Sequence, residues 1–308
     1  MSNVLSNFSF LVFCFLAGIL LKFFKRLPKE TPAVLNGFIF YLSFPAIILL
    51  QFHDITFSRD VLMPVWSGWI LFLVSLLAFG FLGWYLKLDR KTQGALILTA
   101  GLGNTSFVGF PMLEALYGPE ALKTGILIDQ LGSFLVLASL GVLVASIYSG
   151  RGCSFKKIFK RVLAFPPLYA LILAIVLRSV PFAPVVREVL SRLGSVITPL
   201  ALVSVGYQLH LNRKLMRQYC IPLCGGLFYK LIFGPFLITL FYVFVCQVRG
   251  EEIQIAIVEG CMAPMITAAI VVAEYGLNSE LANLMVGIGI PLSFLTVPIW
   301  VRILADWL

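Results

Sequence analysis

An apolar segment in the first half of the chain is interrupted by LGNTSFVGFP at residues 102–111. A second segment, in the other half, is interrupted by EGCMAPMIT at residues 259–267. Because lipid offers no hydrogen bonds, a broken helix at membrane depth persists only inside protein or against a water-filled cavity. Two such breaks in corresponding parts of a chain are typical of the midplane binding site of a secondary transporter.

The composition places the chain among integral membrane proteins. Hydrophobic residues make up 60% of the 308 residues and charged residues only 12%, against roughly a quarter in soluble proteins. Apolar stretches of about 20 residues recur along the chain, and each is long enough to cross a hydrocarbon core of about 30 Å. We therefore predict an all-α polytopic membrane protein. Its net charge of +9 lies in short loops between spans, which excludes nucleic acid as a partner.

Ten transmembrane helices are predicted, and the loop charges orient them. Most lysines and arginines fall in the first, third, fifth and seventh loops, which places those loops in the cytoplasm and both termini outside. We expect a multi-pass protein of the plasma membrane, in bacteria the inner membrane. The spans are predicted near residues 5–22, 33–51, 62–86, 92–117, 121–147, 162–180, 189–209, 219–246, 252–275 and 281–304.

A basic segment divides the chain into two similar halves. Residues 150–161 are predicted to form a cytoplasmic linker between one five-helix repeat at residues 1–149 and another at residues 162–308. An odd number of spans in each half gives the second half an inverted topology. A weak internal echo supports this duplication, because Gln-Phe-His at residues 51–53 recurs as Gln-Leu-His at residues 208–210.

The two interrupted spans run in opposite directions, so we predict that discontinuous helices 4 and 9 cross at their breaks. A second half-helix is expected to start near Pro111 in one span and near Met265 in the other. The unpaired N–H groups at each start carry a partial positive charge, and two such ends at one point form an anion site. The alternative is that glycine and proline only kink two packed helices.

Three segments resemble the auxin efflux carrier family, which also includes bacterial organic-acid carriers. They are NGFIFYLSFP at residues 36–45, GNTSFVGFPMLEALYG at residues 103–118 and APMITAAIVVAEYGL at residues 263–277. The resemblance covers the whole chain and implies a scaffold of helices 1, 2, 6 and 7. It further implies a mobile transport domain of helices 3–5 and 8–10, an elevator mechanism and a homodimer.

The residues at the breaks are the candidate substrate-binding residues. The resemblance implies that Asn104, Pro111 and Pro264 line the substrate pocket. Hydroxyl and amide groups beside them would hydrogen-bond a carboxylate. The full predicted set is Asn104, Thr105, Ser106, Pro111, Ala263, Pro264, Met265 and Thr267.

Acidic residues within the spans are candidates for ion coupling. A carboxylate at mid-bilayer costs about 2.5–3.5 kcal/mol on insertion scales, so each one needs a reason. Asp129, with Gln130 beside it, and Glu259 are predicted near the breaks, where they would carry a proton or ligate a sodium ion. The alternative is a structural role, as a hydrogen-bonded protonated acid or as a partner of Lys230. Lys230 itself is expected to extend its stem toward the cytoplasmic headgroups.

We expect no enzymatic activity and no metal or cofactor other than a coupling H⁺ or Na⁺. The six cysteines show no metal-ligand spacing, and His53 and His210 fall at span ends. The metalloprotease and nucleophile-elbow signatures are absent from the sequence. The predicted function is secondary active transport of a small organic anion, such as an auxin-like or dicarboxylic acid, across the lipid bilayer. The alternative is a ligand sensor built on the same fold.

Overall fold

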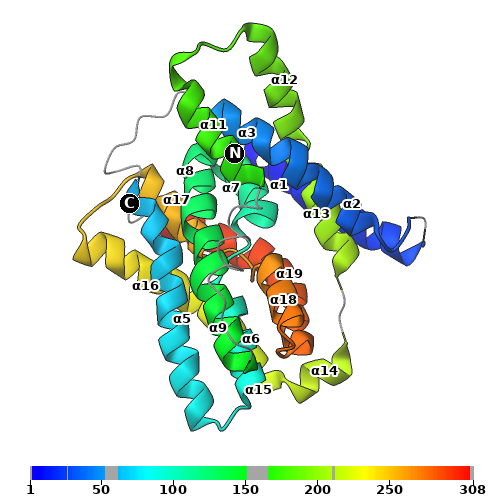
Figure 1. Ribbon diagram of the computed structural model, residues 1–308, viewed down its shortest axis with the longest axis vertical. Coiled ribbons are helices and arrows are strands. Elements are labelled where there is room, and N and C mark those ends of the chain that lie inside the picture. Colours follow the sequence, from blue (N-terminus) through cyan, green and yellow to red (C-terminus); the bar gives the residue numbers. More distant parts are fainter. Residues whose placement is uncertain (1, 26, 53–61, 151–165, 210–211, 306–308) are drawn as a thin grey trace. The chain divides into compact units, whose positions relative to one another are not determined.

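The computed structural model describes residues 2–25, 27–52, 62–150, 166–209 and 212–305 of the chain. All regular structure in these residues is helical (Figure 1). This confirms the predicted all-α class. Residues 151–161 of the predicted linker, and both histidines, lie outside the described residues.

Within the described residues, seven helical segments are long and apolar enough to cross a membrane. They are Ser6–Phe23, Thr31–Phe52, Met63–Tyr85, Ala121–Ser149, Pro184–Gln208, Cys220–Val245 and Ser279–Ala305. Of the other three predicted spans, those at residues 92–117 and 252–275 are interrupted, and that at residues 162–180 is described only from Pro166. A multi-pass helical protein is therefore supported, while ten spans and the inverted repeat remain predictions.

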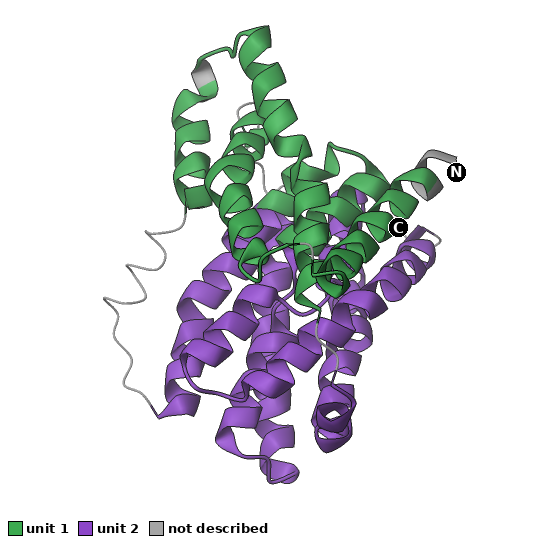
Figure 2. Ribbon diagram, turned by 90° about the vertical axis from the view of Figure 1, so that its right-hand side faces the viewer, with its two compact units in different colours: residues 1–58, 106–126, 161–209 green, residues 59–105, 127–160, 210–308 purple. Residues whose placement is uncertain are grey.

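The chain forms two compact units, each drawn from three separate stretches of sequence (Figure 2). Unit 1 contains residues 1–58, 106–126 and 161–209. Unit 2 contains residues 59–105, 127–160 and 210–308. Each unit is described by itself below.

Unit 1 is held together by close helix packing. Two helices, α1 and α13, lie against each other at glycines, because a methyl group at Gly18 would meet the carbonyl group of Val203, and one at Gly206 would meet that of Phe15. Small residues permit such approach of two backbones in a membrane protein. The helices of unit 1 are α1 (Ser2–Phe23), α2 (Thr31–Phe38), η1 (Ile39–Ser43), α3 (Phe44–Phe52), α7 (Phe110–Tyr117), α11 (Pro166–Val176), η6 (Leu177–Ser179), α12 (Pro184–Ser195) and α13 (Ile197–Gln208).

Unit 2 is built around a buried apolar core. Leu96, Ile97 and Leu98 of α6 have almost no exposed surface, and α6 packs against α5, α9, α18 and α19. The helices of unit 2 are η2 (Met63–Val65), α5 (Trp66–Tyr85), α6 (Arg90–Gly101), η4 (Ile128–Phe134), η5 (Leu137–Gly141), α9 (Val142–Ser149), α14 (Arg213–Gln218), α15 (Cys220–Phe228), η7 (Tyr229–Phe233), α16 (Gly234–Thr239), η8 (Leu240–Val245), α17 (Glu251–Gly260), α18 (Ile266–Glu274) and α19 (Ser279–Ala305). Two further elements, η3 (Thr105–Gly109) and α8 (Ala121–Leu127), contain residues of both units.

Several helices contain wide turns of the π type, in which one extra residue is accommodated. Such turns are rare and often occur at functional sites. Here η3 begins with Thr105, η4 contains Asp129 and Gln130, and η7 contains Lys230. Three of the wide turns thus carry polar residues of the predicted site or charged residues buried in the spans.

Candidate functional site

The breaks of the two interrupted spans both lie in unit 2, where they are joined to each other. α6 ends at Gly101, and α17 ends at Gly260. Between these ends and the next helical turns, Gly103 and Pro264 pair as an antiparallel bridge. We call residues 102–104 and 261–265 the paired breaks.

Backbone hydrogen bonds hold the paired breaks together. The N–H of Asn104 donates to the carbonyl oxygen of Ala263 at 2.7 Å, and the N–H of Met265 donates to that of Leu102 at 3.1 Å. The groups released by unwinding one helix are thereby satisfied by the other, as membrane depth requires. The structure therefore brings together the two interruptions that the sequence placed more than 150 residues apart.

Only one of the two predicted half-helix starts is confirmed. Met265 is extended, and α18 begins at the next residue, as predicted. Pro111 lies in the first turn of α7, but the wide turn η3 has already resumed the helix at Thr105. The predicted start near Pro111 is therefore wrong. A wide turn disturbs the regular hydrogen-bond ladder, so a proline without an N–H is accommodated just after it.

Asp129 is buried and hydrogen-bonded at both carboxylate oxygens. Its exposed fraction is 2%. The hydroxyl of Thr105 donates to Oδ1 at 2.5 Å, and the side-chain amide of Gln130 donates to Oδ2 at 2.7 Å. Thr105, a predicted substrate-binding residue, is thus hydrogen-bonded to Asp129, a predicted coupling residue.

Glu259 is the second buried acid, at the end of α17. Its exposed fraction is 1%, and it interacts electrostatically with Asp129 and Lys230. Within the part of the chain that the structure describes, neither of its carboxyl oxygens has a hydrogen-bond partner. A buried group without such partners is costly to retain, which makes Glu259 a functional candidate.

Lys230 lies at the paired breaks, and its predicted position was wrong. Its exposed fraction is 1%, so the stem does not extend to the headgroups. A methyl group added at Gly103 would lie 3.0 Å from Nζ of Lys230 and 3.2 Å from the carbonyl oxygen of Glu259. Because Gly103 has no side chain, the ammonium group reaches the break. The position of Lys230 in the sequence predicts how far along its span it lies. It does not predict which face of the helix carries it.

The remaining predicted residues divide between the two units. Asn104, Ala263, Pro264 and Met265 are buried at the paired breaks, and Thr267 is half-buried in the first turn of α18. Ser106 and Pro111 are also buried but belong to unit 1. Unit 2 therefore unites Asn104, Thr105, Ala263, Pro264, Met265, Thr267, Asp129, Gln130 and Glu259.

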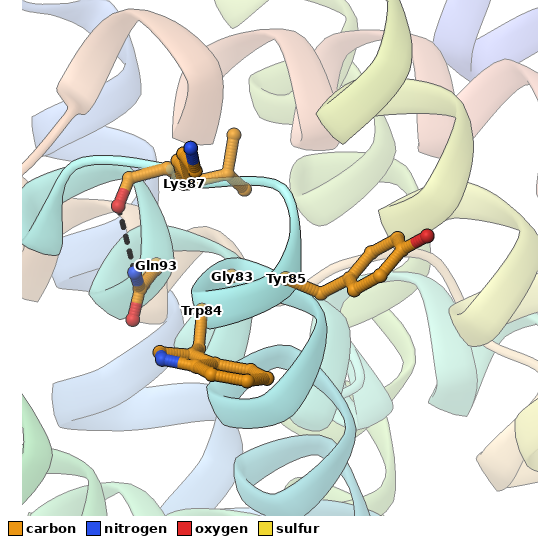
Figure 3. Close-up of a pocket in the computed structure, with 6 residues that line it drawn as sticks. Gly83, Trp84, Tyr85, Lys87 and Gln93 are labelled. Atoms are coloured by element: carbon orange, nitrogen blue, oxygen red, sulfur yellow. Dashed lines mark hydrogen bonds between the residues drawn. The ribbon is translucent and has the colours of Figure 1, made fainter.

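A surface pocket of about 470 Å³ lies elsewhere in unit 2, at the turn between α5 and α6 (Figure 3). Its lining includes Gly83, Trp84 and Gln93, and the amide of Gln93 donates to the carbonyl oxygen of Leu88 at 2.7 Å. None of the predicted site residues lines this pocket. In the described ranges, no three His, Cys, Asp or Glu side chains lie together as a metal site would require.

Comparison with known proteins gives a consistent assignment. The family model described as "Membrane transport protein" matches residues 4–301. An uncharacterized transporter of Methanothermobacter thermautotrophicus is 28% identical over 301 residues, covering 92% of this chain and 93% of the relative. An uncharacterized transporter of Methanocaldococcus jannaschii is 29% identical over 302 residues, covering 94% and 96%.

Proposed function

Because the chain belongs to the membrane transport protein family, we propose that it is a secondary active transporter of a small organic anion. Membership confirms the resemblance seen in the sequence, and the two relatives are themselves named as transporters. An auxin-like or dicarboxylic acid is the substrate class that we propose. The paired breaks are its proposed binding site.

The observation that carries this proposal is the start of α18 at the paired breaks. No side chain of the described residues caps this helix end, so N–H groups of its first turn are available to a ligand. The N-terminus of a helix carries a partial positive charge of about half a unit, which favours an anion. Asn104, buried at 2% exposure, and Thr267 in the first turn supply further hydrogen-bonding groups there.

Further features are proposed from the family resemblance, from the loop charges and, for ion coupling, from the acids within the spans of this sequence. The protein is proposed to work by an elevator movement of helices 3–5 and 8–10 against a scaffold of helices 1, 2, 6 and 7. It is proposed to form a homodimer in the inner membrane, with both termini outside. Asp129, Gln130 and Glu259 are the proposed residues for coupling to H⁺ or Na⁺.

Uptake into proteoliposomes tests the proposal. Radiolabelled acetate, succinate and benzoate are offered under pH, sodium and electrical gradients. We expect the wild-type protein to accumulate at least one of these acids. If an acid stabilises the protein against heating but is never accumulated, the protein is a sensor. If none of the acids is accumulated and none stabilises the protein, an organic-anion substrate is contradicted.

Asn104→Ala tests the position of the binding site. Loss of a hydrogen bond to a charged ligand costs about 1.5–3 kcal/mol, so uptake at low substrate should fall roughly 10- to 100-fold with unchanged thermal unfolding. Asn7→Ala, at an exposed position of α1, is the matched control. Wild-type affinity in a folded Asn104→Ala protein would remove Asn104 from the site.

A further inference from the structure

Among its described residues, unit 2 contains three buried charged side chains, whose charges do not cancel. Asp129, Lys230 and Glu259 have exposed fractions of 2%, 1% and 1%. With all three ionised, the cluster carries one excess negative charge. A substrate anion that entered this cluster would raise the excess to two, which a low-dielectric interior strongly disfavours. Anion binding there therefore requires a cation to enter at the same time.

The two acids differ in the partners they already have. Both oxygens of Asp129 accept hydrogen bonds, from Thr105 and Gln130. The carboxyl oxygens of Glu259 accept none from the described residues, and Glu259 interacts electrostatically with Asp129 and Lys230. A proton added to Glu259 breaks no hydrogen bond seen in the structure. Glu259 is therefore the acid that is able to change its charge.

Lys230 is the group in this cluster that would attract an anion. Its ammonium nitrogen and the carbonyl oxygen of Glu259 both lie close to the position that a Cβ of Gly103 would take, and therefore at the paired breaks. The other titratable groups that interact electrostatically with Lys230 are Cys261 and Glu259. Glu259 is thus the acid that interacts electrostatically with Lys230, and a substrate carboxylate at the breaks would compete with Glu259 for interaction with the same ammonium group.

We propose that Lys230 binds the carboxylate of the substrate, and that Glu259 takes up one proton from solution when the substrate replaces it beside the ammonium group. This inference rests on the proposed function. The charges balance, because the negative charge lost by Glu259 is the one brought by a monocarboxylate, and Lys230 and Asp129 keep theirs. One proton then crosses the membrane with each monocarboxylate, which makes the transporter a proton symporter.

A double-mutant cycle tests the charge pair without any substrate. Lys230→Met leaves two buried acids without a cation, whereas Lys230→Met/Glu259→Gln restores the original net charge of the cluster. We expect the single variant to unfold at a lower temperature in detergent and the double variant to recover most of the loss. Independent effects of the two substitutions would overturn the pairing, whether or not the protein transports anything.

Uptake of labelled acetate, succinate and benzoate tests the roles of the two residues. In the charge-balanced double variant, affinity should fall roughly 30-fold or more, because the substrate loses a buried counter-charge. In Glu259→Gln, exchange of labelled substrate should continue while accumulation driven by a pH gradient is lost. Lys214→Met and Glu252→Gln, both at exposed positions of unit 2, are the matched controls.

The outcomes separate this inference from the proposed function. Three results would each overturn the inference and leave transport itself established. They are wild-type substrate affinity in the double variant, accumulation driven by a pH gradient in Glu259→Gln, and uptake by the wild-type protein that is driven only by a sodium gradient. If the wild-type protein accumulates none of the three acids and is stabilised by none of them, the proposed function itself fails. The double-mutant cycle still decides the charge pair in that case.

Discussion

Unit 1 and unit 2 bury polar groups of different kinds. Among the described residues, the buried polar side chains of unit 1 are uncharged. All three buried charged side chains, Asp129, Lys230 and Glu259, belong to unit 2. A charge in a membrane span costs about 2.5–3.5 kcal/mol on insertion scales, and such residues are usually functional. The ion coupling that we propose is therefore placed in unit 2, which holds all of the buried charged side chains among the described residues.

Glycines show the same contrast between the units. In unit 1, Gly206 allows α13 to approach the backbone of α1 at Phe15. In unit 2, Gly289 of α19 makes room for the ring of Pro264 at the paired breaks. Neither position has room for a methyl group. A methyl group at Gly206 would displace the backbone of a helix, whereas one at Gly289 would displace the paired breaks. Substitution should therefore affect stability in unit 1 and transport in unit 2.

Gly206→Ala should have the largest effect on stability. The added methyl group would meet the carbonyl oxygen of Phe15, which belongs to a helix backbone and cannot rotate away. We expect a loss of about 3 kcal/mol, the upper part of the range for overpacking. Thermal unfolding in detergent measures it. Gly37→Ala is the control, because no atom lies within 4 Å of its added methyl group, and it should be neutral or slightly stabilising.

Thr105→Val should have the next largest effect, because it removes a hydroxyl group that donates to the buried carboxylate of Asp129. Hydrogen bonds to charged groups contribute about 1.5–3 kcal/mol. Thr105→Ser keeps the hydroxyl and should recover most of the loss in stability and uptake. In unit 1, the hydroxyl of Thr198 donates to the half-buried Glu114 at 3.0 Å, so Thr198→Val is the matched comparison. An equal or larger effect of Thr198→Val would contradict the contrast between the units.

Gly289→Ala should impair transport more than stability. Its methyl group would press on the ring of Pro264 and shift the paired breaks, at a cost of about 1–3 kcal/mol. We expect uptake in proteoliposomes to fall by about tenfold at a temperature where the variant remains folded, because a misplaced binding site loses affinity steeply. Gly225→Ala, also in unit 2 but with open space around the added group, should transport normally. Parallel losses of uptake and stability would assign Gly289 to packing alone.

Much of unit 2 could be predicted from the sequence because its breaks are local features. Glycine and proline at residues 103 and 264 mark positions where a helix cannot continue, and lipid forces such positions together. The nearness of Asp129 and Glu259 follows from their distance to the breaks along each span. Their electrostatic interaction in the structure agrees with that expectation.

The position of Lys230 could not be predicted in the same way. The wide turn η7 contains Lys230 and changes the helical register, so the regular period does not show which face the residue occupies. Its ammonium group also lies close to Gly103, which is more than 100 residues away in sequence. The wide turn η3 similarly moved the helix restart from Pro111 to Thr105. Composition does not reveal such wide turns. It also does not show that Gly206 packs against another helix backbone, whereas Gly37 has open space around it.

Asp89 offers the smallest predicted effect, at the exposed start of α6. Its Oδ1 accepts a hydrogen bond from the N–H of Thr92 at 3.0 Å and so caps the helix. Burial would raise the pKa of this carboxyl, but the hydrogen bonds from Thr92 and nearby backbone groups outweigh it and hold the pKa below its usual value. The charged form is thus favoured in the folded protein.

Asp89→Ala should cost about 1 kcal/mol at neutral pH, a typical value for a lost N-cap. Because the folded-state pKa is depressed, this stabilisation is present above the ordinary pKa of aspartate, about 3.9, and is lost as the pH falls through the folded value. The difference in unfolding temperature between wild type and Asp89→Ala should therefore shrink toward pH 3. Asp89→Asn caps without titrating, so its difference from Asp89→Ala should not change with pH. A constant gap between wild type and Asp89→Ala across this range would show that the charge of Asp89 adds nothing to the cap.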